Sequence, residues 1–223
     1  MSKKAVILLS GGLDSATTLY YAKQKGYQTH CLIFDYGQRH RKEIRQAVKI
    51  AKHSRSDYRV VRIALPWKGS ALLDKSLKLP KNRRIIPTEI PATYVPARNI
   101  IFLSFAASYA EAIGADTIFI GANAVDYSGY PDCRPEFYKA YQLALKRGLK
   151  TGVEGKAIKI YTPLIRKTKA QIIKLGLRLK APYYLTWSCY QGGRKPCGRC
   201  DSCLLRQKGF QQAQHKDHFL INN

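Results

Sequence analysis

A glycine-rich loop near the amino terminus combines residue types that bind phosphate with an acid. Residues 10–15 read Ser-Gly-Gly-Leu-Asp-Ser and directly follow the apolar run 5–9. Loops of this kind hold phosphate with backbone N–H groups and with the N-terminus of the next helix. The familiar phosphate loop ends in Gly-Lys-Ser or Gly-Lys-Thr, whereas this loop has Asp14 and Ser15 and contains no lysine. The residues therefore indicate phosphate chemistry in which a carboxylate takes part.

Four cysteines near the carboxyl end have the spacing of a metal site. They form the pattern C-x7-C-x2-C-x2-C and are Cys189, Cys197, Cys200 and Cys203. Four thiolates fill the tetrahedral shell of zinc and leave no open position, which predicts one structural Zn²⁺ per chain. A redox C-x-x-C pair would need only two cysteines, and disulfides are rare in a cytoplasmic chain. Zinc is favoured over both.

Three further polar segments follow or precede apolar runs. They are residues 35–40 (Asp-Tyr-Gly-Gln-Arg-His), 95–99 (Val-Pro-Ala-Arg-Asn) and 121–137. Each of them alone could be an ordinary turn or the start of a helix. In a doubly wound parallel sheet, ligands bind beyond the carboxyl ends of the strands. We therefore expect these segments to meet the glycine loop at one site.

The periodicity of apolar residues predicts the elements that position these segments. Strands are expected at residues 3–9, 29–35, 58–65 and 116–122. Helices are expected at residues 15–25, 40–54 and 98–113, and a Thr-x-x-Gln capping box at Thr168 begins another. Strands that alternate with helices predict an α/β fold with a doubly wound parallel sheet.

The sequence also predicts a division of the chain. Residues 1–180 are expected to form the catalytic domain and residues 181–223 a zinc-binding segment. Residues 65–97 interrupt the alternation of strands and helices with five prolines and six basic residues. A loop of this length within a compact domain predicts a lid or an insertion.

The charge of the chain is strongly positive. Its 39 Lys and Arg against 14 Asp and Glu give a formal net charge of +25, and residues 144–180 hold eleven basic residues and one acid. Such a surplus can mark a nucleic-acid surface, but no aromatic-basic recognition motif accompanies it. A solvated basic face with weak, non-specific nucleic-acid binding is favoured. No apolar run is long enough for a signal peptide or a membrane span, so the expected location is the cytoplasm.

The segment SGGLDS after a first strand resembles the pyrophosphate loop of the N-type ATP pyrophosphatases, whose pattern is S-G-G-x-D-S. Members of that superfamily cut ATP between the α and β phosphates and use AMP to activate an oxygen atom. The resemblance implies an adenine nucleotide alpha hydrolase-like fold, bound ATP, and Mg²⁺ handled by Asp14, with Asp14 and Ser15 as catalytic residues. The residues implied in ATP binding are Leu9, Ser10, Gly11, Gly12, Leu13, Asp14, Ser15, Ala16, Thr17, Thr18, Arg39, Arg98 and Asn99.

The segments FDYGQRH, VPARN and DYSGYPDCRPEF and the four cysteines occur in this order across nearly the whole chain. Together they resemble the 7-cyano-7-deazaguanine synthases, in many of which glycine stands at the position of Ala97. The resemblance implies an ATP-dependent ligase of queuosine biosynthesis that forms a homodimer. Such an enzyme converts 7-carboxy-7-deazaguanine and ammonia to the nitrile through adenylated intermediates and an amide. The residues implied in substrate binding are Asp126, Tyr127, Asp132 and Arg134.

Two other functions remain open from the sequence. A transfer-RNA thiolase of the same superfamily would use the basic surface, but it needs a reactive cysteine outside the zinc set. Only Cys31 and Cys133 are available for that role. A non-enzymatic, zinc-containing RNA-binding protein would leave the segments SGGLDS and GYPDCR without a purpose.

Overall fold

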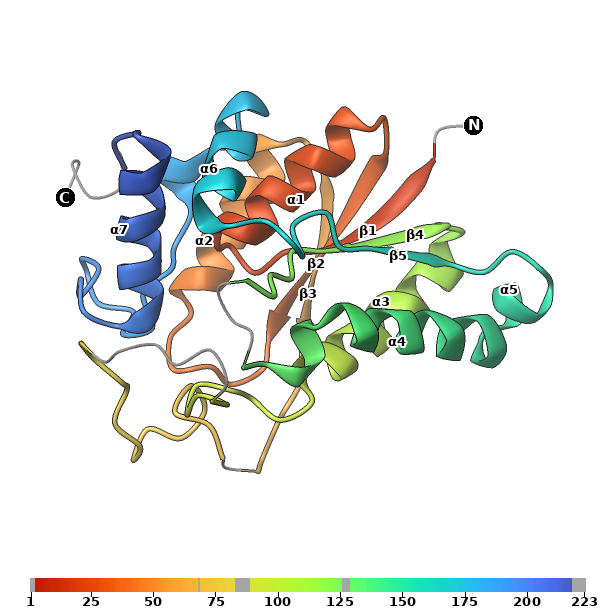
Figure 1. Cartoon of the computed structure of the whole chain (residues 1–223). Coiled ribbons are helices and arrows are strands. Elements are labelled where there is room, and N and C mark those ends of the chain that lie inside the picture. Colours follow the sequence, from red (N-terminus) through yellow and green to blue (C-terminus); the bar gives the residue numbers. More distant parts are fainter. Residues whose placement is uncertain (1–2, 68, 83–88, 126–128, 218–223) are drawn as a thin grey trace.

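A parallel sheet forms the centre of the molecule, as the sequence predicts, and it has five strands (Figure 1). The computed structural model describes residues 3–67, 69–82, 89–125 and 129–217. The strands lie in the order β3-β2-β1-β4-β5, so the direction of winding reverses between β1 and β4. Their bounds are β1 Lys4–Leu8, β2 Gln28–Asp35, β3 Asp57–Arg62, β4 Thr117–Ile120 and β5 Lys159–Tyr161.

Helices cover both faces of the sheet because successive residues of its central strands point to opposite sides. On β1, Ala5 and Ile7 face α1 (Leu13–Gln24) and α2 (Lys42–His53). Val6 and Leu8 face the opposite layer. That layer contains α3 (Arg98–Ile113) and α4 (Pro135–Gly148), followed by the short α5 (Lys150–Val153). The first turns of α1 and α3 therefore both lie at the carboxyl edge of the sheet.

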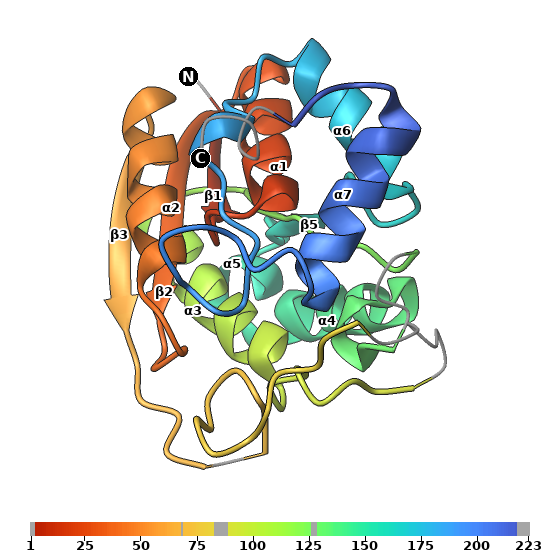
Figure 2. The same ribbon diagram turned by 90° about the vertical axis from the view of Figure 1, so that its left-hand side faces the viewer.

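The carboxyl-terminal segment packs on the outer side of α1. Figure 2 shows α6 (Lys169–Arg178) and α7 (Asp201–Ala213) side by side next to α1. Ile172 of α6 and Phe210 of α7 share a core with Leu13. The expected domain boundary at residue 180 therefore lies directly after α6, and residues from both sides of it contribute to one core.

Several element boundaries agree with the sequence prediction. The Thr168 capping box forms, with its side chain accepting the backbone N–H of Gln171. Helix α3 ends before Gly114, which has the left-handed φ of 66°. The sequence does not predict the helices α4, α5 and α7 or the three-residue edge strand β5. Among the described residues, no helix is both long and apolar enough to cross a membrane.

The segment 65–97 runs from the end of β3 to the cysteine region and back to α3. Lys81 forms an antiparallel bridge with Cys200, and the Asn82 N–H donates to the Arg199 carbonyl at 2.9 Å. The Ala71 N–H donates to the Ala92 carbonyl at 2.7 Å. The described parts of this segment are thus held by backbone hydrogen bonds, and its action as a lid stays a prediction.

Ala97 is a strained residue directly before α3. It has the left-handed backbone angles φ 54° and ψ 19°, which cost a residue with a Cβ roughly 1–2 kcal/mol. We expect Ala97→Gly to raise the free energy of unfolding by about 0.5–1 kcal/mol, because relief of this strain exceeds the added entropy of the unfolded chain. Urea denaturation measures the change. Ala107→Gly, in the interior of the same helix, should instead lower stability by about 1 kcal/mol, and a loss at both positions would contradict the assignment of strain.

Candidate active site

The glycine loop is held in shape by two serines. The Ser15 hydroxyl donates to the Gly12 carbonyl at 3.1 Å and accepts from the Ser10 N–H at 3.2 Å. The two serine hydroxyl oxygens lie 3.0 Å apart. Gly12 is the N-cap of α1, so the first N–H groups of that helix point out of the loop without intrahelical acceptors. The loop therefore offers a rigid group of N–H donors to an anion.

Position 11 requires glycine for two reasons: there is no space for a side chain, and the backbone angle is left-handed. Its φ is +84°, and a Cβ added to it would overlap the backbone carbonyl of Glu43 in α2. At Gly121, which follows β4, an added Cβ would lie 3.0 Å from the backbone carbonyl of Asp14. These contacts place α2 and the end of β4 directly against the loop.

A cavity of about 280 Å³ opens at the carboxyl edge of the sheet. It is lined by the loop, by the segments after β2 and β4, and by the first turn of α3, so four of the polar segments meet there. The lining residues that the sequence assigned to ATP are Leu9, Ser10, Gly12, Leu13, Asp14, Ser15, Arg98 and Asn99. Tyr36, Gln38 and Asn123 come from the polar segments that were expected at this site. Lining residues that the sequence did not single out include Glu43, Phe102, Lys169, Trp187, Ser188 and Arg206.

A lysine from outside the loop reaches the loop's carboxylate. The Lys169 Nζ lies 2.9 Å from Oδ1 and 2.8 Å from Oδ2 of Asp14, and Lys169 is only 8% exposed. The loop itself contains no lysine, but α6 brings one to its carboxylate. Lys169 follows the Thr168 cap directly, but nothing in the spacing connects it to a loop 155 residues earlier.

Arg98 and Glu43 are two further charged residues that line the cavity. The Arg98 guanidinium donates to the Tyr36 hydroxyl at 3.5 Å. Glu43, in the first turn of α2, is half-buried and lines the same cavity. Burial raises the pKa of Glu43 to about 7, although the positive charge of Arg98 opposes this shift. The sequence signal for Glu43 is weak, because an acid in the first turn of a helix is common.

Several residues assigned to ATP lie behind the loop and do not line the cavity. Gly11 and Ala16 are covered by neighbouring chain, and the Thr17 hydroxyl donates to the Leu13 carbonyl at 2.9 Å. The Thr18 hydroxyl donates to the Asp14 carbonyl at 2.9 Å. These residues support the loop from the core side.

Arg39 also lies outside the cavity lining. Its guanidinium donates to the backbone carbonyl of Asp74 at 2.8 Å and to that of Leu77. In this arrangement Arg39 anchors the segment 65–97, and its assignment to phosphate or adenine has no contact to support it.

The residues assigned to the deazaguanine substrate are differently placed. Asp132 Oδ2 accepts the Asn99 N–H at 3.0 Å, and Asn99 Nδ2 donates to the Asp132 carbonyl at 3.0 Å. These hydrogen bonds fix the start of α3, so Asp132 and Asn99 brace each other. Arg134 is exposed and outside the cavity lining, while Asp126 and Tyr127 lie outside the described residues.

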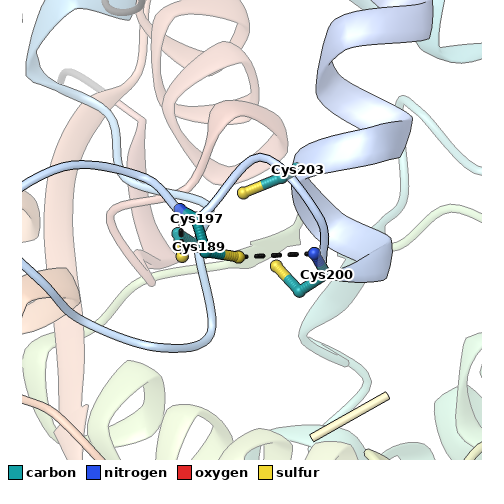
Figure 3. A group of neighbouring side chains, drawn as sticks. All are labelled: Cys189, Cys197, Cys200 and Cys203. Carbon is teal, nitrogen blue, oxygen red and sulfur yellow. Dashed lines mark hydrogen bonds between the residues drawn. The ribbon is translucent and has the colours of Figure 1, made fainter. Parts of the chain in front are cut away.

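The four cysteines form a cluster at the start of α7 (Figure 3). Their Sγ atoms all lie within 4.8 Å of one another, and a zinc–sulfur distance of about 2.3 Å requires sulfur separations of about 3.8 Å. The N–H groups of Gln191 and Cys197 donate to Cys189 Sγ at 3.4 and 3.3 Å, and the Cys200 N–H donates to Cys197 Sγ at 3.3 Å. Such N–H donors stabilise thiolates, so donor type, spacing and surroundings fit a structural zinc ion.

The cysteine segment also contacts the glycine loop. The Trp187 N–H donates to the Gly11 carbonyl at 2.9 Å, and the indole Nε1 donates to the Cys189 carbonyl at 2.7 Å. The Lys42 Nζ lies 3.6 Å from the centroid of the Trp187 ring. One fully buried tryptophan thus connects the metal cluster to the loop.

The two remaining cysteines are poor nucleophiles. Burial raises the pKa of Cys31 and the pKa of Cys133 to about 12 each, so both thiols stay protonated at neutral pH. Sulfur transfer needs a thiolate, and this finding weighs against the thiolase alternative.

Comparison with known proteins agrees with this geometry. The family described as "Queuosine biosynthesis protein QueC" matches residues 4–214. The 7-cyano-7-deazaguanine synthase of Thermoplasma acidophilum is 54% identical over 216 residues, covering 96% of this chain and 90% of that protein. The synthase of Acetivibrio thermocellus is 55% identical over 212 residues, covering 95% and 94%.

The fold alone is shared more widely. The solved structure of the U34-tRNA thiolase NcsA from Methanococcus maripaludis aligns with a TM-score of 0.51 at 17% identity, covering 94% of this chain and 65% of that one. At this identity the likeness concerns the sheet and its helices. The family match, the two relatives and the loop geometry together lead to one conclusion: the chain belongs to the 7-cyano-7-deazaguanine synthases, the ATP-dependent enzymes of queuosine biosynthesis.

Proposed function

We propose that the cavity binds ATP against the glycine loop and 7-carboxy-7-deazaguanine beside it, and that the nitrile forms through two successive adenylations. The observation that carries this proposal is the Asp14–Lys169 pair at the open N-terminus of α1. An anion there meets helix N–H groups, a buried ammonium group and a carboxylate within one small volume.

The phosphates of ATP would lie against the first turn of α1. The N–H groups of that turn and the Lys169 ammonium group stabilise the negative charge that develops on pyrophosphate as it leaves. The single carboxylate of Asp14 suits Mg²⁺, which usually takes one or two carboxylates together with phosphate oxygens and water. When bound, the ion would neutralise phosphate charge.

The first adenylation activates the acid. An oxygen of the substrate carboxylate attacks the α phosphorus of ATP, and pyrophosphate leaves. Ammonia then attacks the acyl carbon and loses a proton, and AMP leaves to give the amide. Arg98 supplies a fixed positive charge for the substrate carboxylate or for the AMP phosphate.

The second adenylation removes the remaining oxygen. The amide oxygen attacks the α phosphorus of a second ATP, and pyrophosphate leaves again. The amide nitrogen then loses its two protons as the carbon–oxygen bond breaks, which yields the nitrile and AMP. The apolar lining from Leu9, Phe102 and Trp187 keeps water away from both adenylates, which water would hydrolyse.

A reconstituted reaction tests this function. We expect the purified protein, with 7-carboxy-7-deazaguanine, ATP, magnesium and an ammonium salt, to give the nitrile, with the amide as a transient species by mass spectrometry. Two ATP should yield two AMP and two pyrophosphate per nitrile, because each oxygen leaves on one AMP. Supplied amide should be converted with one ATP.

Omission of the ammonium salt is the matched control, and it should stop the reaction before the amide. Release of ADP and phosphate as the only nucleotide products would contradict the adenylation chemistry. An enzyme that stops at the amide would contradict the named product.

A further inference from the structure

Glu43 is a carboxylate in the cavity to which the reaction outlined above assigns no task. It is the second residue of α2, and its backbone lies against Gly11 of the glycine loop. Its side chain is half-buried and lines the cavity. Glu43 is therefore close to the nucleotide loop while belonging to a different element.

The Glu43 carboxylate has no hydrogen-bond donor of its own. Within the described part of the chain, no N–H or O–H group donates to it. Asp14, by contrast, is paired with Lys169, and Asp132 accepts the Asn99 N–H. A half-buried carboxylate on a cavity wall, with no donor from the chain, can accept hydrogen bonds from a bound ligand that brings N–H groups.

The Glu43 carboxylate can pair with only some edges of a purine-like ring. A carboxylate offers two oxygens side by side and no hydrogen for donation. The guanine-like edge of 7-carboxy-7-deazaguanine presents two adjacent donors, the ring N1–H and the 2-amino group. The corresponding edge of adenine presents one donor beside one acceptor, which would face the lone pairs of the carboxylate. Glu43 therefore matches the substrate ring and mismatches the adenine of ATP.

We propose that Glu43 binds the N1–H and 2-amino groups of the substrate ring and so determines specificity for 2-amino-substituted deazapurines. The inference rests on the proposed function. Hydrogen bonds between a carboxylate and N–H donors are stronger in a partly buried site than in water, and Arg98 lines the same cavity as Glu43. Glu43 is thus a substrate-binding residue separate from the Asp14–Lys169 pair.

A comparison of two substrates tests the proposal. Wild-type enzyme should prefer 7-carboxy-7-deazaguanine over the analogue without the 2-amino group by roughly tenfold to a hundredfold in kcat/KM, which corresponds to one bidentate base contact. Glu43→Gln should raise the KM for the true substrate and reduce the preference to about threefold or less. The KM for ATP should stay within about twofold. Glu136→Gln, an exposed acid at the start of α4, is the matched control and should keep the wild-type preference.

The possible results distinguish a failure of the Glu43 proposal from a failure of the proposed function. Equal kcat/KM of the two substrates with wild-type enzyme would overturn the proposal without any variant. A Glu43→Gln enzyme that keeps the preference, or that mainly loses affinity for ATP, would overturn it as well. Should Glu43→Gln not fold, Glu43→Asp gives the same comparison, with a reduced preference as the expected result. Failure of wild-type enzyme to convert 7-carboxy-7-deazaguanine would instead contradict the proposed function.

Discussion

Asp14→Asn is expected to lower kcat/KM by roughly a thousandfold while the fold is kept. The exchange preserves the size of the side chain but removes the charge that binds Lys169 and, in the proposed function, Mg²⁺. Removal of one charged or donor group that acts on the transition state costs about 10²–10³ in rate. Release of AMP and pyrophosphate measures turnover, and circular dichroism measures the fold.

Two further variants distinguish catalysis from stability. Asp14→Asn leaves the Lys169 ammonium group, which is nearly buried, without its partner, and unpaired buried charges destabilise. Adding Lys169→Met removes that charge, so the double variant should regain thermal stability and remain inactive. Asp57→Asn, at a 69% exposed position of the edge strand β3 whose carboxylate lies 3.4 Å from His30 Nδ1, should keep wild-type activity. A double variant that regains activity would show that Asp14 acts only on stability.

Cys200→Ser is expected to release the metal and to lower the melting temperature by about 10–20 °C. Structural zinc contributes several kcal/mol to folding, and each kcal/mol corresponds to about 2–4 °C in a chain of this size. Cys200 also bridges Lys81, so the segment 65–97 should loosen together with the cluster. Metal analysis should give one zinc per wild-type chain and none in the variant.

We expect the loss of zinc to weaken ATP binding as well. Trp187 connects Cys189 to Gly11, so we expect the KM for ATP to rise by about tenfold or more in Cys200→Ser. Cys31→Ala, which removes a fully buried thiol far from the cluster in sequence, should keep zinc and the KM for ATP while costing some stability. Wild-type protein that is metal-free and unaffected by a chelator would contradict the four-thiolate site.

The fold was predictable wherever a pattern is local. The apolar spacing of Ile44, Ala47 and Ala51 specifies α2, and the capping box at Thr168 specifies the start of α6. Helix α4 and strand β5 were missed because their signals are weak. Only Tyr138 and Leu145 of α4 are buried, and β5 is three residues long with its first and last residues exposed.

The sequence predicts where in the fold the candidate site lies, but only some of the residues that line it. The polar segments at the strand ends meet because parallel strands share one edge. Lys169 and Glu43 carry no local signature, since their importance arises from packing against Asp14 and Gly11. Asp132 accepts a hydrogen bond from the Asn99 N–H and so braces the start of α3, while its assignment to substrate stays a prediction.

The long sequence distance between the loop and its partners has a consequence for synthesis on the ribosome. Residues 10–15 leave the exit tunnel long before Lys169, which lies 155 residues after Asp14, and before Trp187. A nascent chain therefore cannot complete the cavity at the glycine loop until α6 and the cysteine segment have been translated. Contacts of such high sequence separation also form late and slowly in folding. Truncated products from interrupted translation should consequently be unable to hydrolyse ATP wastefully in the cell.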